Sequence, residues 1–405
     1  MRPLNILLAP SGFHNTLSAS AVADCLEAAI NVATAGNPPI LRKFPLCNYR
    51  QDFSRTLQQR YGWTWINMVV MGPYRDRVEA GFWKSNTTDT AFLDVEDING
   101  SKFLPANFDD STNTTSYGVG QVIQSVLDAG CNRIIVIGGY SIAFDGGAGM
   151  LQALGAKLLD ANGKEMGAAP GGPELSRLVD IDMSGIHPEL RTRGAVRLET
   201  VYYSEEVLCG PNGVALGDGP QRDASMEQIE DLTFGLEAFG LAASKILHEV
   251  IQEKPRSGIS GGLGSGLMLL NSHFLSSLLA ADMYFDLPGL IDETPWDLLI
   301  TGAGYLSTDN ELVQPTLDIM KVARDRKVRT IVVVGLAGDG VPADTVINET
   351  TTVIQIPGRP QFSAEETQSI ISMAVDNCIR TLYLGMSFVE DVKENGVQSD
   401  TMDTT

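Results

Sequence analysis

The sequence predicts an α/β protein: a doubly wound parallel sheet domain into which a second α/β domain is inserted. Two patterns predict this class. Short, wholly apolar runs recur along the chain, as expected for strands buried on both faces, and amphipathic segments of helical period separate them. Glycine-rich turns follow several of these runs. Such alternation favours parallel strands joined by helices over a sandwich or a helix bundle.

The elements follow in order from the N-terminus. The opening apolar run predicts a core strand, and Ser18 or Ser20 is placed to cap the helix after it. Strands are expected at residues 5–9, 134–137, 297–301 and 330–335, with further β-like pieces at 63–71 and 90–95. Helices are expected at residues 19–33, 119–129, 232–252 and 315–326.

At 405 residues the chain exceeds the roughly 250–300 residues at which one core stops growing. The composition changes in the middle of the chain. There, polar loops and segments rich in Gly, Pro and Asp replace the long segments with a regular apolar pattern. We therefore expect a first domain from residues 1–65 and 290–389, and an inserted second domain from 66–289. Residues 390–405 are expected to form a polar, frayed tail.

Charge and apolar content limit the partners. The net charge of -21 argues against nucleic acid or an anionic membrane surface, although a local pocket can still oppose the global field. No apolar run reaches the roughly 18–20 residues of a membrane span, and the N-terminus does not resemble a signal peptide. Five scattered cysteines suit a reducing compartment. We expect a cytoplasmic protein with a small-molecule substrate; the oligomeric state is left open.

The most informative motif is Asp145-Gly146-Gly147-Ala148-Gly149, in the segment that follows the strand predicted at 134–137. Its glycines allow close approach of a ligand, and free N–H groups of the following helix could face an anion. Asp145 has two readings that can coexist. It can bind a metal, orient a hydroxyl or act as a base, or it can cap the helix and fix the turn.

This motif resembles the signature of the bacterial-type glycerate 2-kinase family, and five other segments are similar to motifs of that family in the same order. The six segments span residues 8–19, 114–120, 144–158, 208–222, 260–266 and 300–304. The resemblance implies a flavodoxin-like domain with an inserted second domain. It also implies ATP-dependent phosphoryl transfer.

Several charged positions of the family differ here. His14 stands where the family has a lysine, and residues 48–52, which include Arg50 and Asp52, replace an acidic glycine-rich run. Tyr203-Ser204-Glu205-Glu206 replaces an Asp-x-x-Asn element. The family's Glu, Arg and Asp fall at Ala303, Tyr305 and Ser307, and its Gly-Lys pair at Val313-Gln314. Each lost charged contact would cost about 2–4 kcal/mol of transition-state stabilisation, so ordinary kinase activity is not expected.

Asp145 and His14 are the candidate catalytic residues, since His14 can exchange a proton near neutral pH. The candidate substrate-binding residues lie in or beside the six motifs and the altered positions: Ser11, Arg50, Asp52, Ser116, Tyr203, Glu205, Glu206, Gly261, Gly262, Tyr305 and Asp309. For each of these alone, a solvated loop residue or close glycine packing is the competing explanation. No metal ligands and no cofactor are expected.

Three functions remain open. The first is a repurposed family member that performs acid/base chemistry, such as isomerisation, cyclisation or elimination, on a small organic molecule in a cleft between the domains. The second is an ATP-dependent glycerate or hydroxy-acid kinase with a rearranged site, which would use ATP and Mg²⁺. The third is a non-catalytic binding protein. The retained glycine motifs favour the first.

Overall fold

The computed structural model describes residues 2–13, 16–46, 53–54, 57–58, 61–104, 112–192, 194–218, 224–306, 314–337, 350–356 and 362–399. The chain forms two compact units. Unit 1 combines residues 1–56 with 281–405, and unit 2 is the segment 57–280 between them. The sequence placed these boundaries a little later in the chain, at 66 and 289. The two units are described separately.

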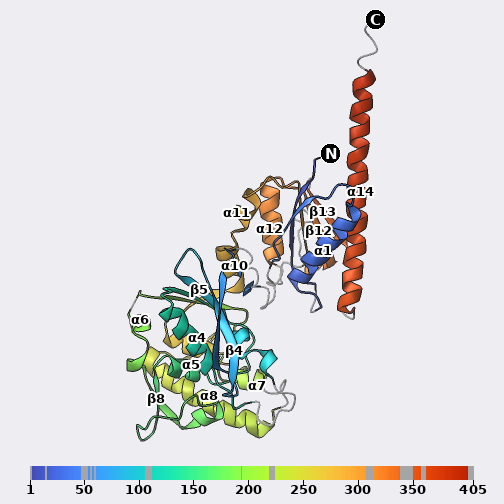
Figure 1. Cartoon of the computed structure of the whole chain (residues 1–405). Helices are drawn as coiled ribbons and strands as arrows, with labels where there is room; N and C mark the ends of the chain where they lie inside the picture. The colour runs from blue at the N-terminus through green and yellow to red at the C-terminus, as the bar shows by residue number, and fades with distance from the viewer. Residues whose placement is uncertain are drawn as a thin grey trace. The chain divides into compact units, whose positions relative to one another are not determined.

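Unit 1 is built on a five-stranded sheet whose paired strands are all parallel (Figure 1). Across the sheet the order is β13-β12-β11-β1-β2. Counted along the chain this is the order 2-1-3-4-5 of flavodoxin-like folds. The strands are β1 (Asn5–Pro10), β2 (Ile40–Lys43), β11 (Leu298–Leu306), β12 (Thr330–Ala337) and β13 (Thr351–Gln355). The predicted α/β class is confirmed.

Helices cover this sheet because its central strands are apolar on both faces. α1 and α14 pack against each other on one face, and Figure 1 shows α12 on the opposite side of the strands. Ser18 caps α1, as predicted, by accepting a hydrogen bond from the N–H of Ala21 (3.2 Å). The helices are α1 (Ala19–Ala33), α11 (Leu287–Asp292), α12 (Gln314–Asp325) and α14 (Ala364–Ser399), with α10 (Ser277–Phe285) at the junction of the two units.

Asp297 joins the starts of β1 and β11. Its carboxylate accepts hydrogen bonds from the N–H of Asn5 (2.9 Å) and from both terminal nitrogens of Arg2 (2.9 and 2.5 Å). Partial burial opposes the effect, but these donors hold the pKa of Asp297 below its usual value. The carboxylate therefore stabilises the fold above pH about 4, and this contribution is lost as the pH falls through the lowered pKa.

The substitution Asp297→Asn is expected to lower the free energy of unfolding at pH 7 by about 1–2 kcal/mol, because a charged acceptor is replaced by a neutral one. It should also flatten the decline in stability below pH about 4. Urea midpoints between pH 3 and 7 measure both effects. If the urea midpoint of the variant fell below pH about 4 as steeply as that of the wild type, this role for Asp297 would be contradicted.

Unit 2 contains a mixed six-stranded sheet in the order β10-β9-β6-β5-β4-β3. β5, β6, β9 and β10 are parallel, and β4 runs antiparallel to β3 and β5. The strands are β3 (Thr64–Met71), β4 (Arg77–Lys84), β5 (Thr90–Asp94), β6 (Arg133–Ile137), β9 (Arg197–Tyr202) and β10 (His273–Ser276). β7 (Lys157–Asp160) and β8 (Leu178–Asp182) pair as a separate antiparallel hairpin.

The large core of unit 2 lies between this sheet and its helices. The α-helices are α3 (Val95–Asn99), α4 (Tyr117–Asp128), α5 (Ala148–Ala153), α6 (Pro188–Arg191), α7 (Val214–Asp218), α8 (Met226–Leu247) and α9 (Leu263–Leu269). Short 3₁₀ turns occupy Ser101–Phe103, Pro173–Arg177 and Met183–Gly185. α8 begins earlier than predicted, because Ser225 and Gln228 form a reciprocal capping box at its start.

The expectation that the chain is frayed from residue 390 onward is wrong for residues 390–399. α14 continues to Ser399, so residues 390–399 are helical, and residues 400–405 lie outside the described residues. The segment lacks proline, and Glu390, Lys393, Glu394 and Gln398 favour a helix, so the helix can continue past the end of the domain core. Within the described part of the chain, no helix combines the length and apolarity needed to cross a membrane.

Candidate functional site

Asp145 lies in the turn between β6 and α5 and is 1% exposed. Its Oδ2 accepts hydrogen bonds from the N–H of Ser116 (2.7 Å), the hydroxyl of Ser116 (3.0 Å), the hydroxyl of Thr115 (3.2 Å) and the N–H of Gly149 (3.0 Å). Its Oδ1 accepts one from the N–H of Gly147 (3.0 Å). Burial raises the pKa of Asp145, and the hydrogen bonds from Ser116, Gly149 and Gly147 oppose that rise.

These bonds place one carboxylate at the N-termini of two helices. Ser116 directly precedes α4, and Gly149 lies in the first turn of α5. A negative charge is favourable at such ends, where backbone N–H groups lack helical partners. The hydroxyl of Ser116 also accepts a hydrogen bond from the N–H of Met150 in α5 (3.0 Å). Ser116 therefore both donates to Asp145 and accepts from α5, and these bonds connect the start of α4 to the start of α5.

The N–H groups expected to face an anion are therefore occupied. Those of Gly147 and Gly149 bind the Asp145 carboxylate, that of Ala148 binds the Asp145 carbonyl (2.9 Å), and that of Met150 binds Ser116. An external anion would have to displace a buried carboxylate to reach them. Of the two readings of Asp145, the geometry supports the structural one, in which Asp145 fixes the turn and caps α5.

A second glycine turn packs directly against the first. Gly261 and Gly262 precede α9, as Gly146 and Gly147 precede α5, and all four have positive φ. A Cβ on Gly261 would lie 1.8 Å from the carbonyl oxygen of Ala143. One on Gly262 would lie 2.8 Å from the Cα of Gly146. Close backbone packing thus accounts for Gly261 and Gly262 without a ligand.

A cluster of aromatic and charged side chains lies beside the carboxyl end of β9, and we call it the Arg256 cluster: Tyr202, Glu205, Arg256 and Phe274. The guanidinium of Arg256 lies over the rings of Tyr202 (5.3 Å) and Phe274 (5.8 Å). Its Nε is 3.3 Å from Oε2 of Glu205. Ligands of parallel α/β sheets bind at this end of the strands, so the cluster is a candidate part of the site.

Backbone conformation and burial distinguish the Arg256 cluster from an ordinary surface group. Arg256 has a φ of +74°, a left-handed conformation that costs a residue other than glycine about 1–3 kcal/mol. Burial raises the pKa of Tyr202, and the neighbouring Glu205 raises it further. Arg256 and Glu205 are nevertheless reachable from solvent, with side chains 31% and 57% exposed.

Three predicted site residues follow β9. Glu205 is part of the Arg256 cluster, and Tyr203 and Glu206 flank it in the chain. The carbonyl of Glu206 accepts a hydrogen bond from the N–H of Gly258 (3.0 Å), which ties this loop to the glycine-rich segment after Arg256. Ser116, in contrast, belongs to the buried Asp145 network and not to this exposed edge.

In unit 1, Ser11 and Tyr305 lie near the carboxyl ends of β1 and β11. These strands are adjacent, and the chain turns in opposite directions from them, which is the switch point where flavodoxin-like sheets bind ligands. The hydroxyl of Ser11 is buried and lies 2.5 Å from that of Thr316 at the start of α12. Tyr305 is 37% exposed. The structure thus places both predicted residues at a position suited to binding.

Four predicted residues lie outside the described residues: His14, Arg50, Asp52 and Asp309. Their assignment stays a prediction. Among the residues that are described, no group of three or more His, Cys, Asp or Glu side chains could hold a metal ion.

Sequence reasoning missed Arg256, Tyr202 and Phe274. No short motif connects them, because the contacts join three segments that are far apart in the chain and meet only where β9 and β10 pair. The available signal was the position of Arg256 two residues before Gly258, at the start of the glycine-rich segment.

Comparisons with known proteins give a consistent result. The model of the glycerate kinase family matches residues 6–383. A glycerate kinase of Bacillus subtilis is 32% identical over 336 residues, 83% of this chain and 85% of that protein. A glycerate 2-kinase of Escherichia coli is 30% identical over 398 residues, 95% of this chain and 99% of that protein. A crystal structure assigned as glycerate kinase 2 from Salmonella typhimurium LT2 superposes with a TM-score of 0.74 at 26% identity, covering 95% and 100% of the two chains.

The expectation of a repurposed, non-kinase enzyme is therefore wrong. Similarity to proteins named glycerate kinase extends over nearly the whole chain, and it favours the kinase alternative. Each altered charged position had been counted as a lost contact. Charged side chains of other segments were left out of that count, among them Arg256, which folding brings beside Tyr202 at the end of β9.

Proposed function

Because the chain belongs to the glycerate kinase family, we propose that it transfers the γ-phosphoryl group of ATP to a hydroxyl of glycerate or a closely related hydroxy acid. The observation that carries this proposal is the match to the family over residues 6–383, together with relatives of that name that align over most of both chains. The name of the Escherichia coli relative points to the 2-hydroxyl.

In this reaction the bond from the γ-phosphorus to the bridging oxygen of ADP breaks. A bond from the same phosphorus to the substrate oxygen forms, and the hydroxyl loses its proton. Catalysis of such transfers is mainly positioning and neutralisation of charge. Both substrates are anionic and the chain has a net charge of -21, so local cations must oppose the global field.

Arg256 is the described cation best placed for this task. Its guanidinium presents a planar set of donors suited to phosphate or carboxylate, and it lies over the rings of Tyr202 and Phe274. We assign it to binding an anionic group of a substrate. Glu205 pairs with this guanidinium and balances its charge.

In unit 1, Ser11 and Tyr305 at the switch point are assigned to substrate binding. Ser11 is held by Thr316 and by a hydrogen bond from its N–H to the carbonyl of Gly302 (2.7 Å), so its position is fixed by two strands and a helix. The Tyr305 side chain is partly open to solvent, so it can contact a small acid bound beside it.

Mg²⁺ fits this arrangement if the phosphates of ATP supply most of its ligands, because it commonly takes only one or two protein carboxylates. Glu205 is an exposed carboxylate of this kind. Asp145 does not fit, since both of its oxygens already accept hydrogen bonds within the protein. The bound ion would neutralise charge on the phosphates.

Nucleotide binding can be tested directly by a thermal-shift titration of the full chain with Mg-ATP. We expect the midpoint to rise with ligand concentration, because ligands that bind only the folded state stabilise it. Mg²⁺ alone and Mg-ADP are the matched controls. Absence of any shift by Mg-ATP at millimolar concentration would contradict the kinase proposal.

A further inference from the structure

In unit 2, the edge strand β3 is long and carries no charge. Among the described residues, the two larger sheets end in the edge strands β13, β2, β10 and β3. The first three contain five, four and four residues, whereas β3 contains eight. β2 also carries Arg42 and Lys43, and such charges discourage pairing with another chain. β3 has no charged residue, proline or glycine, so it lacks the usual protection of an edge strand.

The backbone of β3 alternates between its partner β4 and the open edge. The N–H of Gly72, directly after the strand, donates to the carbonyl of Asp76 (2.7 Å) in the register of the β3–β4 pair. The backbone groups of Gly72 and of every second residue before it therefore point to β4. Those of Trp65, Asn67 and Val69 point to the other side. In the described part of the chain, no group on that side hydrogen-bonds to them.

The open edge ends at Met71, because α4 covers this end of β3. The N–H of Met71 donates to the side chain of Gln121 on α4 (2.7 Å). A Cβ on Gly118, also on α4, would lie 2.1 Å from the carbonyl oxygen of Met71. The open stretch therefore covers residues 65–69, with Asn67 at its centre.

We propose that two copies of this chain pair through this stretch of β3, in antiparallel orientation around a two-fold axis at Asn67. Such symmetry sets each residue opposite the one equally far beyond Asn67. Trp65 then faces Val69, and Ile66 faces Met68, so apolar side chains meet on both faces of the joined sheet. The two Asn67 amides face each other, and each offers donors and an acceptor. Three N–H and three C=O groups per copy form about six backbone hydrogen bonds.

The match of β3 to itself favours a second copy over an unrelated peptide. An axis at Ile66 or Met68 would set Asn67 opposite Trp65 or Val69, a polar side chain against an apolar one. The axis at Asn67 pairs amide with amide and apolar with apolar. Eight residues span about 27 Å at 3.4 Å per residue, which makes a small interface. We therefore expect a reversible dimer at micromolar concentrations.

The test is the mass of the full chain by sedimentation velocity between micromolar and several hundred micromolar concentrations. We expect a concentration-dependent species of twice the 43.6 kDa chain mass. Asn67→Asp and Val69→Asp should each weaken the dimer about tenfold or more, because they set two carboxylates opposite each other or one opposite Trp65. Both side chains are exposed in the single chain, so folding should be retained. Val179→Asp is the matched control: Val179 is a 42% exposed valine on β8, and the variant should dimerise normally.

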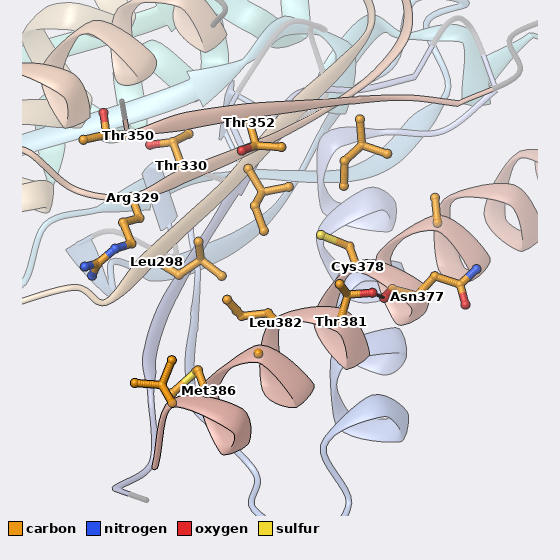
Figure 2. Close-up of a pocket in the computed structure, with 15 residues that line it drawn as sticks. Leu298, Arg329, Thr330, Thr350, Thr352, Asn377, Cys378, Thr381, Leu382 and Met386 are labelled. Atoms are coloured by element: carbon orange, nitrogen blue, oxygen red, sulfur yellow. Dashed lines mark hydrogen bonds between the residues drawn. The ribbon is translucent and has the colours of Figure 1, made fainter. Parts of the chain in front are cut away.

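Another apolar surface of the chain provides a second control. In unit 1, a groove of about 980 Å³ lies between the sheet and α14, as Figure 2 shows, and Val389, which is 53% exposed, lines it. Val389→Asp should leave the dimer unchanged. A dimer that Val389→Asp abolishes, and that both β3 variants leave intact, would overturn the proposal.

The position of the two-fold axis is tested by exchanging charge. In an equal mixture of Asn67→Asp and Asn67→Lys, a carboxylate of one copy faces an ammonium group of the other. The mixture should therefore dimerise about tenfold more tightly than either variant alone. A mixture of Val179→Asp and Val179→Lys should show no such gain. A wild-type chain that stays monomeric at every concentration would overturn the proposal, and so would mixed Asn67 variants that fail to recover.

Discussion

Replacing Asp145 by alanine is expected to lower the free energy of unfolding of unit 2 by at least about 5 kcal/mol. The substitution leaves three buried N–H groups and two hydroxyls without their acceptor. Each such group costs about 1–3 kcal/mol when buried unpaired. Since whole domains are stable by only about 5–15 kcal/mol, the variant should be largely unfolded. Urea denaturation followed by circular dichroism measures the loss.

Asp160→Ala is the matched control for this result. Asp160 also accepts two backbone hydrogen bonds, from Asn162 and Lys164, but it lies in an exposed turn. Water can replace its carboxylate, so a much smaller effect is expected. Stability of Asp145→Ala within about 1 kcal/mol of the wild type would contradict the structural account of Asp145, because surface substitutions vary by about that amount or less.

A kinetic measurement separates the two readings of Asp145. In Asp145→Asn, the shape of the side chain is kept while one acceptor oxygen becomes a donor. If Asp145 only holds the turn, stability falls but kcat per folded molecule stays within a few-fold of the wild type. A loss of kcat of about a hundredfold or more in a stable variant would instead indicate a part in the chemistry.

Replacing Arg256 by glycine is expected to lower kcat/KM by about 10- to 100-fold, which corresponds to the 1.5–3 kcal/mol of a charged hydrogen bond. The structure predicts that stability does not fall in parallel, because glycine adopts the φ of +74° without strain. Steady-state kinetics with both substrates varied will show which KM rises, and hence whether the guanidinium binds the nucleotide or the acid.

Two further variants make this prediction specific. Arg256→Lys keeps the charge but not the planar donors, so it should restore activity only in part. Arg197→Ala removes an arginine that also pairs with a glutamate, Glu199, but at the opposite end of β9. It should leave kcat/KM unchanged. Full activity in Arg256→Gly would show that Arg256 does not bind a substrate.

The sequence was sufficient for most of the fold. Apolar runs buried on both faces identified the central strands of both sheets, and Ser18 gave the start of α1, since burial and capping are local signals. The start of α8 was missed although Ser225 and Gln228 carry a capping-box pattern. The end of α14 was missed because a polar segment can be a solvated helix as well as a disordered tail.

The site could be predicted less well. Ser11 and Tyr305 stay predictions; both lie near the carboxyl ends of β1 and β11, because motif positions after parallel strands converge on one edge of the sheet. The role of Asp145 could not be decided, since an aspartate before glycines looks the same whether it faces a ligand or, as here, the buried donors of Ser116. Arg256 depends on rings more than 15 residues away in the chain in both directions, and on a backbone conformation that no residue preference predicts.

We propose above that the chain is a kinase of glycerate or a close hydroxy acid. The most direct test of this proposal is to incubate the purified full chain with Mg-ATP and glycerate and to follow ADP and phosphorylated acid together. We predict that both form in equal amounts, and only when acid, ATP and Mg²⁺ are all present. Folded protein that binds Mg-ATP, yet yields no acid-dependent ADP with glycerate or related hydroxy acids, would contradict the claim.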